Sequence, residues 1–250
     1  MKQCALMIGL CVTVFFATAQ TSFIEYQKKF PRFAGALKSK EDTIKKQFVK
    51  AGVQWPPKDV YLRSFKFDSQ LEVWARNSKK EPYKLVKTFK VCALSGGLGP
   101  KRMQGDYQVP EGFYYINEFN PRSEYHLGLG VNYPNASDLL LSDSAKPGSE
   151  IYIHGSCVTV GCIPIMDHQM EELYLITSFA KSNGVDFIPV HIFPVKFNVP
   201  KSVQKLNEAT KDDVDYSRFA QRLKDVYDYF EQNKKLPVIS INTKGEYVIL

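Results

Sequence analysis

A histidine and a cysteine lie close together in the ten residues from Ile153 to Cys162, IHGSCVTVGC. A thiol is mostly protonated at neutral pH, and a neighbouring imidazolium or backbone amide dipoles lower its pKa and create a nucleophile. The spacing therefore predicts Cys162 as the nucleophile and His154 as its proton donor and acceptor. Gly161 lets the backbone approach a substrate closely, so we expect backbone N–H groups around it to hold an oxyanion.

Each of these residues also has a structural interpretation. Cys162 could be a buried thiol or a disulfide partner. Thr159 is a candidate for substrate binding or for orienting His154, although a threonine in a β-rich turn is as often structural. His126 is a second candidate for the substrate cleft, and a structural histidine is an equal alternative.

The N-terminus predicts export from the cytoplasm. Lys2 gives a positive start, residues 5–16 form a mostly apolar run, and residues 17–19 read Ala-Thr-Ala, the form of a signal-peptidase site. The apolar run is shorter than the roughly 20 residues that span a bilayer. Residues 1–19 are therefore a predicted signal peptide, and no membrane span is expected.

Three cysteines remain after residue 19, namely Cys92, Cys157 and Cys162. An odd number in an oxidising compartment indicates one disulfide and one free thiol. Three pairings are open, and we favour Cys92 with Cys157, which leaves Cys162 free.

A metal site is the competing prediction from another class. His154, Cys157, Cys162 and His168 have a spacing not far from that of a zinc knuckle. The oxidising compartment argues against it, and so does the prediction that Asp167 and His168 begin a helix, so we expect neither a metal nor a cofactor. The glycines at 96–99 lack the pattern of a nucleotide-binding loop.

The composition is that of a globular enzyme, with 44% hydrophobic and 13% aromatic residues. This is enough for one large domain or a domain with appendages. The formal charge is +7, but the basic residues are scattered and form no stripe of the kind that binds nucleic acid.

Hydrophobic periodicity predicts a β-rich core between helices. A first helix over 40–51 has Ser39 as its N-cap and ends at Gly52, and a second begins at Asp167 as N-cap. A third helix covers 216–232. The predicted strands are 60–67, 70–75, 83–94, 112–117, 124–131, 150–153 and 185–197, followed by a hairpin of 236–242 and 246–250.

Several motifs together resemble the L,D-transpeptidase catalytic domain family. The glycines, Lys101, Gly105-Asp106 and Pro110 to Tyr114 resemble that family's G-x-K…G-D…T-P-E-G-x-Y pattern, with Val109 in place of threonine. IHG at 153–155 resembles its histidine strand, and TVGC at 159–162 its nucleophile turn, with Val160 in place of histidine. The short gap between histidine and cysteine is similar to a periplasmic murein-processing group that includes an amidase releasing proteins attached to diaminopimelate.

The resemblance implies an α+β fold, a mostly antiparallel, β-sandwich-like catalytic domain with flanking helices. It places an N-terminal helical segment at 20–57, the catalytic domain at 58–199 and a helix with a β-hairpin at 200–250. The implied partners are peptidoglycan stem peptides, with a murein-linked protein as an alternative substrate, and the implied location is the periplasm.

The implied chemistry is a cysteine thioester formed at meso-diaminopimelate. The same acyl-enzyme serves a transpeptidase, an L,D-carboxypeptidase or an amidase, and the sequence leaves the three open. The sub-branch resemblance favours hydrolysis or amidase activity, while the family is named for transpeptidation. An inactive murein-binding relative is disfavoured because both reactive side chains are present.

Overall fold

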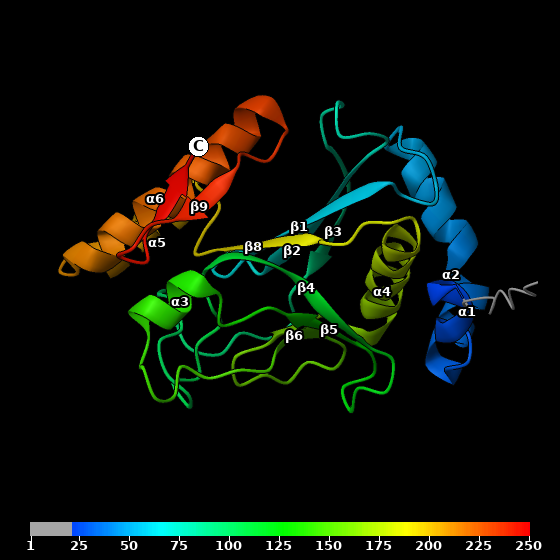
Figure 1. The fold of residues 1–250 in the computed structure, drawn as a ribbon, viewed down its shortest axis with the longest axis horizontal. Coiled ribbons are helices and arrows are strands. Elements are labelled where there is room, and N and C mark those ends of the chain that lie inside the picture. Colours follow the sequence, from blue (N-terminus) through cyan, green and yellow to red (C-terminus); the bar gives the residue numbers. More distant parts are fainter. Residues whose placement is uncertain (1–21) are drawn as a thin grey trace, which may run out of the picture.

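The computed structural model describes residues 22–250 and contains a mixed eight-stranded sheet with helices on both of its faces (Figure 1). The sheet order is β3-β2-β1-β8-β4-β5-β6-β7, and only β1–β8 and β6–β7 are parallel. The strands are β1 Asp59–Phe65, β2 Gln70–Arg76, β3 Lys84–Lys90, β4 Gly112–Asn120, β5 Gly128–Val131, β6 Ile151–His154, β7 Ile163–Pro164 and β8 Pro189–Phe193. The predicted α+β, mostly antiparallel fold is confirmed, with one curled sheet. The predicted signal peptide lies outside the described residues.

Strand β1 is buried on both of its faces, since all seven of its residues are buried. Val60 and Leu62 belong to the main hydrophobic core, while Tyr61 and Phe65, which alternate with them, join two aromatic clusters on the opposite face. A central strand of this kind needs helices on both sides of the sheet. The chain supplies them from its two ends.

The N-terminal helices and α4 cover the face with the main core. They are α1 Phe23–Gln27, α2 Pro31–Lys50 and α4 Asp167–Ser182, and α4 lies beside α2 in Figure 1. The helix predicted over 40–51 begins nine residues earlier, because Pro31 is pre-organised for a first helical turn. The predicted N-cap Ser39 is inside the helix, where its hydroxyl donates to the Gly35 carbonyl.

The N-cap of α4 is also one residue from its predicted place. Met166 is the N-cap, and Asp167 is the first helical residue. The Asp167 carboxylate instead accepts a hydrogen bond of 2.8 Å from the backbone N–H of Ser156, in the loop after β6. The acidic residue therefore stabilises the loop that follows the candidate catalytic histidine.

The C-terminal region covers the opposite face. It consists of α5 Pro200–Thr210, α6 Val214–Asn233 and the antiparallel hairpin of β9 Ile239–Ile241 and β10 Tyr247–Ile249. Leu223 and Tyr227 of α6 pack with Phe65 and Phe193 of the sheet. Helix α5 was not predicted, and it begins at a proline, as α2 does.

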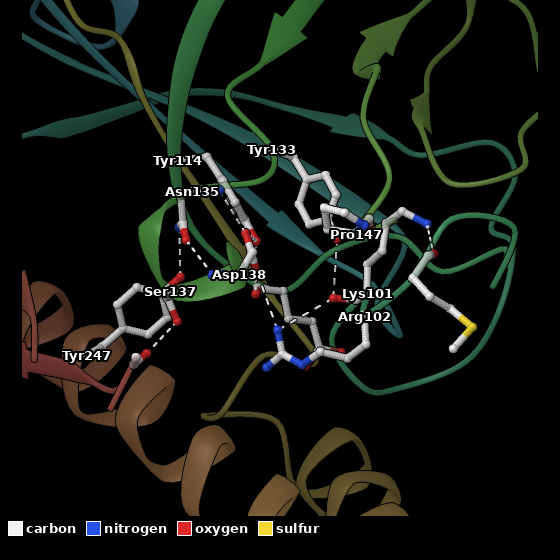
Figure 2. A network of polar contacts seen from close by, with 12 residues as sticks. Lys101, Arg102, Tyr114, Tyr133, Asn135, Ser137, Asp138, Pro147 and Tyr247 are labelled. Atoms are coloured by element: carbon white, nitrogen blue, oxygen red, sulfur yellow. Dashed lines mark hydrogen bonds and ion pairs between the residues drawn. The ribbon is translucent and has the colours of Figure 1, made fainter. Parts of the chain in front are cut away.

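A short helix, α3 Ala136–Leu141, connects this hairpin to β4 (Figure 2). Asn135 and Asp138 form a capping box at its start. The Asn135 amide also donates to the Tyr247 hydroxyl at 2.9 Å, and the Ser137 hydroxyl donates to the Gly245 carbonyl at 2.6 Å. The hairpin is thus held by hydrogen bonds to the helix.

In the main sheet, three predicted strands are longer than the observed ones by four or more residues. The structure has 84–90 instead of 83–94, 128–131 instead of 124–131, and 189–193 instead of 185–197. Strand β5 starts late because His126 has a φ of +72°, outside the β region. None of the helices among residues 22–250 is long and apolar enough to cross a bilayer.

Candidate active site

The parallel pairing of β6 with β7 brings the predicted nucleophile and histidine together. Ile153 pairs with Ile163 and His154 with Pro164, so Cys162, one residue before β7, lies opposite Tyr152. Side chains alternate along a strand, which places Tyr152, His154 and Cys162 on one face of the sheet. Ile153 and Ile163 point the other way, into the core.

The turn before β7 is closed by Thr159. Its hydroxyl donates to the Cys162 carbonyl at 2.8 Å and accepts the Gly161 N–H at 3.0 Å. Gly161 has a φ of +153°, and a Cβ there would lie 3.2 Å from the Gln108 carbonyl oxygen. The turn therefore requires both the threonine hydroxyl and a glycine.

Cys162 is a free, half-buried thiol. Its sulfur accepts the Tyr152 N–H at 3.4 Å, and the thiol donates to the Glu150 carbonyl oxygen at 3.6 Å. Burial raises the pKa of Cys162, while the Tyr152 N–H and the more distant charge of Lys101 oppose this effect. The resting group is therefore a thiol, which has to lose its proton during attack.

His154 is almost fully buried, with 3% of its surface exposed. Its Nδ1 lies 2.5 Å from the Gly155 carbonyl oxygen, which assigns the proton to Nδ1 and the lone pair to Nε2. Burial lowers the pKa of His154, so the ring is neutral at pH 7. The Tyr125 ring covers it, with 4.8 Å between the ring centroids.

The pair is therefore a neutral thiol beside a neutral imidazole, and not the low-pKa thiolate that the sequence suggested. No hydrogen bond joins Cys162 to His154 among the described residues, because the thiol proton is directed at Glu150. The arrangement suits general-base activation of the thiol.

Of the two backbone N–H groups at Gly161 and Cys162, only one has a hydrogen-bond acceptor among the described residues. The Gly161 N–H is already bound by Thr159. The Cys162 N–H finds no acceptor within residues 22–250. We therefore infer that Cys162 itself offers the free amide for an oxyanion, while Gly161 supplies the backbone shape.

The disulfide joins Cys92 to Cys157, the pair that the sequence favoured, with 5.5 Å between the Cα atoms. It fixes the loop between His154 and Cys162 to the segment that follows β3. The predicted zinc alternative would need the Cys157 thiol, which this disulfide occupies. No group of three or more His, Cys, Asp or Glu side chains able to hold a metal occurs within residues 22–250.

His126 lies in the turn before β5. Its Nε2 is 3.2 Å from a carboxylate oxygen of Glu171 on α4, and its Nδ1 is 4.0 Å from Asp167. Its backbone carbonyl accepts a hydrogen bond from Arg32 of α2. These contacts connect the turn to the helices, and the structure shows no contact between the imidazole and Cys162.

The segment 97–111 forms the other side of the nucleophile turn. Lys101 bonds Asp106 at 2.5 Å, and Asp106 accepts the N–H groups of Arg102, Met103 and Gln108. Glu111 accepts from the buried Lys66 of the segment after β1 at 3.0 Å. The residues of the G-D and P-E-G motifs thus stabilise the fold of the segment 97–111. This segment places the Gln108 carbonyl next to Gly161.

A cavity of about 690 Å³ lies away from this chemistry, between the segment 98–102 and α6. Its walls include Arg102, Phe219 and Tyr247, and neither Cys162 nor His154 lines it. We place the site by the reactive residues, since a cavity without a nucleophile or base offers no route to the predicted reaction. Tyr152, which the sequence analysis overlooked, could have been found as the residue two before His154 on the same strand.

Comparisons with known proteins show the family of the chain. A family model described as the L,D-transpeptidase catalytic domain, YkuD, matches residues 68–192. The chain is 33% identical over 221 residues to "Putative L,D-transpeptidase YafK" of Escherichia coli K12, covering 87% of this chain and 84% of that protein. Solved structures with similarity include the helical cell shape determining protein Pgp2 of Campylobacter jejuni, 20% identical over 80% of each chain with a TM-score of 0.43. Another is Bd1075 of Bdellovibrio bacteriovorus, 17% identical over 76% of this chain and 79% of that one, with a TM-score of 0.39. The chain belongs to the L,D-transpeptidase catalytic domain family.

Proposed function

We propose that the protein is a peptidoglycan-processing enzyme that forms a thioester between Cys162 and the carbonyl of meso-diaminopimelate in a stem peptide. The observation that carries the proposal is the free thiol of Cys162 on the same sheet face as His154, with the other two cysteines in a disulfide. Family membership supplies the substrate class.

The resting protonation states define the order of proton transfers. As the Cys162 sulfur attacks the carbonyl, Nε2 of His154 takes the thiol proton, and the N–H of Cys162 is placed to bind the developing oxyanion. The imidazolium then protonates the leaving amine, and the thioester remains. Neutral His154 next accepts a proton from the incoming amine or water, and Cys162 leaves as the thiol when its proton returns.

The second substrate decides the name of the reaction. An amine gives transpeptidation, which agrees with the printed name of the curated relative. Water gives an L,D-carboxypeptidase when D-alanine leaves, or an amidase when the leaving amine belongs to a murein-linked protein. The proposal includes a periplasmic location after removal of residues 1–19, because the substrate is found there.

The experiment is a mass-spectrometric product analysis of the purified protein without residues 1–19. The substrates are diaminopimelate muropeptides, with and without an attached peptide from a murein-bound protein. Exchanged or cross-linked products would establish a transpeptidase, and release of D-alanine or of the attached peptide would establish a hydrolase. Cys162→Ala should abolish every product and the thioester adduct.

A histidine pair gives a matched control. His154→Gln should lower kcat/KM by about 10²- to 10⁴-fold, as expected for loss of a general base. His168→Gln changes an exposed histidine on α4 and should leave activity unchanged. Full activity in Cys162→Ala, or equal losses in the two histidine variants, would refute the assignment.

A further inference from the structure

Four aligned positions cross the sheet next to the nucleophile. Glu118 of β4 pairs with Gly130 of β5, Gly130 pairs with Tyr152 of β6, and Tyr152 lies opposite Cys162. Directly paired residues point to the same face. Glu118 and Tyr152 therefore lie on the face of Cys162 and His154, in a row that crosses three strand spacings, roughly 14 Å.

Gly130 in this row and Gly128, which pairs with His154 in the next row, form a flat floor. A Cβ at Gly130 would lie 2.8 Å from the Glu118 Cβ and 3.4 Å from the Tyr152 ring, and a Cβ at Gly128 would also lie 3.4 Å from that ring. The Tyr152 ring consequently lies over β5 and reaches β4. Its hydroxyl donates to a carboxylate oxygen of Glu118 at 2.6 Å.

The Glu118 carboxylate keeps unused hydrogen-bonding capacity. Tyr152 is the one hydrogen-bond partner found for it among residues 22–250, and Glu118 is exposed. The hydrogen bond to Glu118 raises the pKa of Tyr152 to about 12, with burial and the charge of Glu150 adding to the effect. Tyr152 therefore stays a neutral donor at pH 7, and a carboxylate has further acceptor sites for a second donor.

We propose that Glu118, oriented by Tyr152, binds the free side-chain ammonium group of the acyl donor and so acts as a specificity-determining residue. The inference rests on the proposed function, in which the donor is diaminopimelate. This amino acid carries a second amino group at the end of its side chain. With its carbonyl at Cys162, that side chain can extend along the Tyr152 ring, which covers the glycine floor, toward Glu118, where an ammonium group would pair with the carboxylate.

The test compares two donors that differ in this amine alone. One is a muropeptide tetrapeptide with free diaminopimelate amine, and the other is the same compound with the amine acetylated. A charge-assisted hydrogen bond predicts a preference for the free amine of about 10- to 100-fold in kcat/KM. Glu118→Gln should reduce this preference to about threefold or less, mainly by raising KM for the free amine, because the charge of the acceptor is gone.

Two further variants separate recognition from structure. Glu124→Gln removes an exposed carboxylate outside the row and should retain the full preference. Tyr152→Phe keeps the Glu118 charge and should retain most of the preference while lowering activity toward both donors. Equal losses toward both donors in Glu118→Gln would show that Glu118 only anchors Tyr152, and would overturn the inference.

A binding measurement keeps this result separate from failure of the proposed chemistry. Calorimetry of the two donors with Cys162→Ala, with and without Glu118→Gln, needs no turnover. Preference for the free amine that depends on Glu118 supports the inference, whereas equal binding of both donors overturns it. Absence of a thioester on wild-type Cys162 would refute the proposed function alone.

Discussion

Replacement of Thr159 by valine tests how the nucleophile turn is held. Valine has the same shape and the same β-branched backbone preference, so the change removes the hydroxyl alone. That hydroxyl makes two hydrogen bonds, with the Cys162 carbonyl at 2.8 Å and the Gly161 N–H at 3.0 Å. Both bonds lie within the turn that sets the position of the Cys162 sulfur.

The magnitude follows from these two bonds. Each contributes about 0.5–1.5 kcal/mol to stability, which gives about 1–3 kcal/mol for the pair. Thr159 is half-buried, so water can replace part of the loss, and we take about 1–2 kcal/mol. A turn destabilised by this amount is ordered about 5- to 30-fold less often relative to its open forms. We therefore expect kcat/KM to fall by about 5- to 30-fold at most, through kcat, with KM little changed.

The assay is steady-state turnover of a diaminopimelate tetrapeptide, together with urea unfolding of each variant. Thr159→Ser restores the hydroxyl and should be within about twofold of wild type. Thr210→Val is the matched control, because Thr210 is also half-buried and its hydroxyl bonds the Leu206 carbonyl on α5, far along the chain from Cys162. It should leave kcat and KM unchanged.

Two results would refute this reasoning. A rise in KM at constant kcat would mean that Thr159 contacts substrate, which is the binding role that the sequence left open. A rise in kcat would mean that the Gly161 N–H, freed from Thr159, is the better oxyanion donor.

Three other outcomes are expected. Iodoacetamide should label Cys162 in the native protein and leave Cys92 and Cys157 unlabelled, because these two form the disulfide; label on Cys92 would contradict the disulfide. The rate of Cys162 labelling, followed by peptide mass, should still rise at alkaline pH since burial raises the pKa of Cys162. One proton is shared between the Cys162 sulfur and Nε2 of His154. Because burial lowers the pKa of His154 and raises the pKa of Cys162, kcat/KM should be constant around neutral pH, fall at acid pH when His154 becomes an imidazolium, and fall at alkaline pH when Cys162 loses its proton; an activity maximum at acid pH that depends on a Cys162 thiolate would be inconsistent with this. Burial lowers the pKa of His191 to about 3 from 6.5. As the pH falls, the unfolded chain therefore binds a proton before the folded chain does, and the free energy of unfolding should fall by about 3 kcal/mol from pH 7 to pH 4. In urea unfolding, His191→Asn should lack this contribution to the pH dependence of the free energy of unfolding, and an equal pH dependence in both proteins would contradict the assignment.

The sequence was informative where chemistry is encoded locally. His154 and Cys162 are eight residues apart, and the strand predicted over 150–153 is one residue out of step with β6, Ile151–His154, which includes the histidine. The odd cysteine count predicted one disulfide and one free thiol, and the favoured pair among the three possible ones is the pair that the structure joins. The first of these inferences depended on residue type and spacing among neighbours in the chain, and the second on a count of cysteines.

The sequence was uninformative where the site depends on strand pairing. Glu118 and Tyr152 are 34 residues apart, and nothing in their neighbourhoods shows that β5 lies between them with glycines facing the tyrosine. Register is set by the whole sheet, and a shift of one residue would move Tyr152 to the core face. Protonation states were missed for a similar reason, because burial, which depends on the complete fold, decides the pKa of His154 and of Cys162.

The C-terminal hairpin lies beyond the residues that the family model matches, and it packs against the start of β4. Gly112 opens β4 with a φ of +147°, and a Cβ there would lie 2.5 Å from the Tyr247 hydroxyl, so glycine and hairpin require each other.

The same interdependence extends to buried charge. Arg63 of β1 is 3% exposed and bonds Glu72 and, on α6, Glu231. Loss of α6 would remove one of these carboxylates and expose the aromatic face of β1, leaving a partly unpaired charge in a site built for two partners. Glu111 also connects α6 to the sheet, because it accepts hydrogen bonds from Lys66 and from the Tyr216 hydroxyl of α6. It belongs to the segment 97–111, which places Gln108 against the nucleophile turn. The position of Cys162 therefore depends on residues after 200 as well as on those of the sheet.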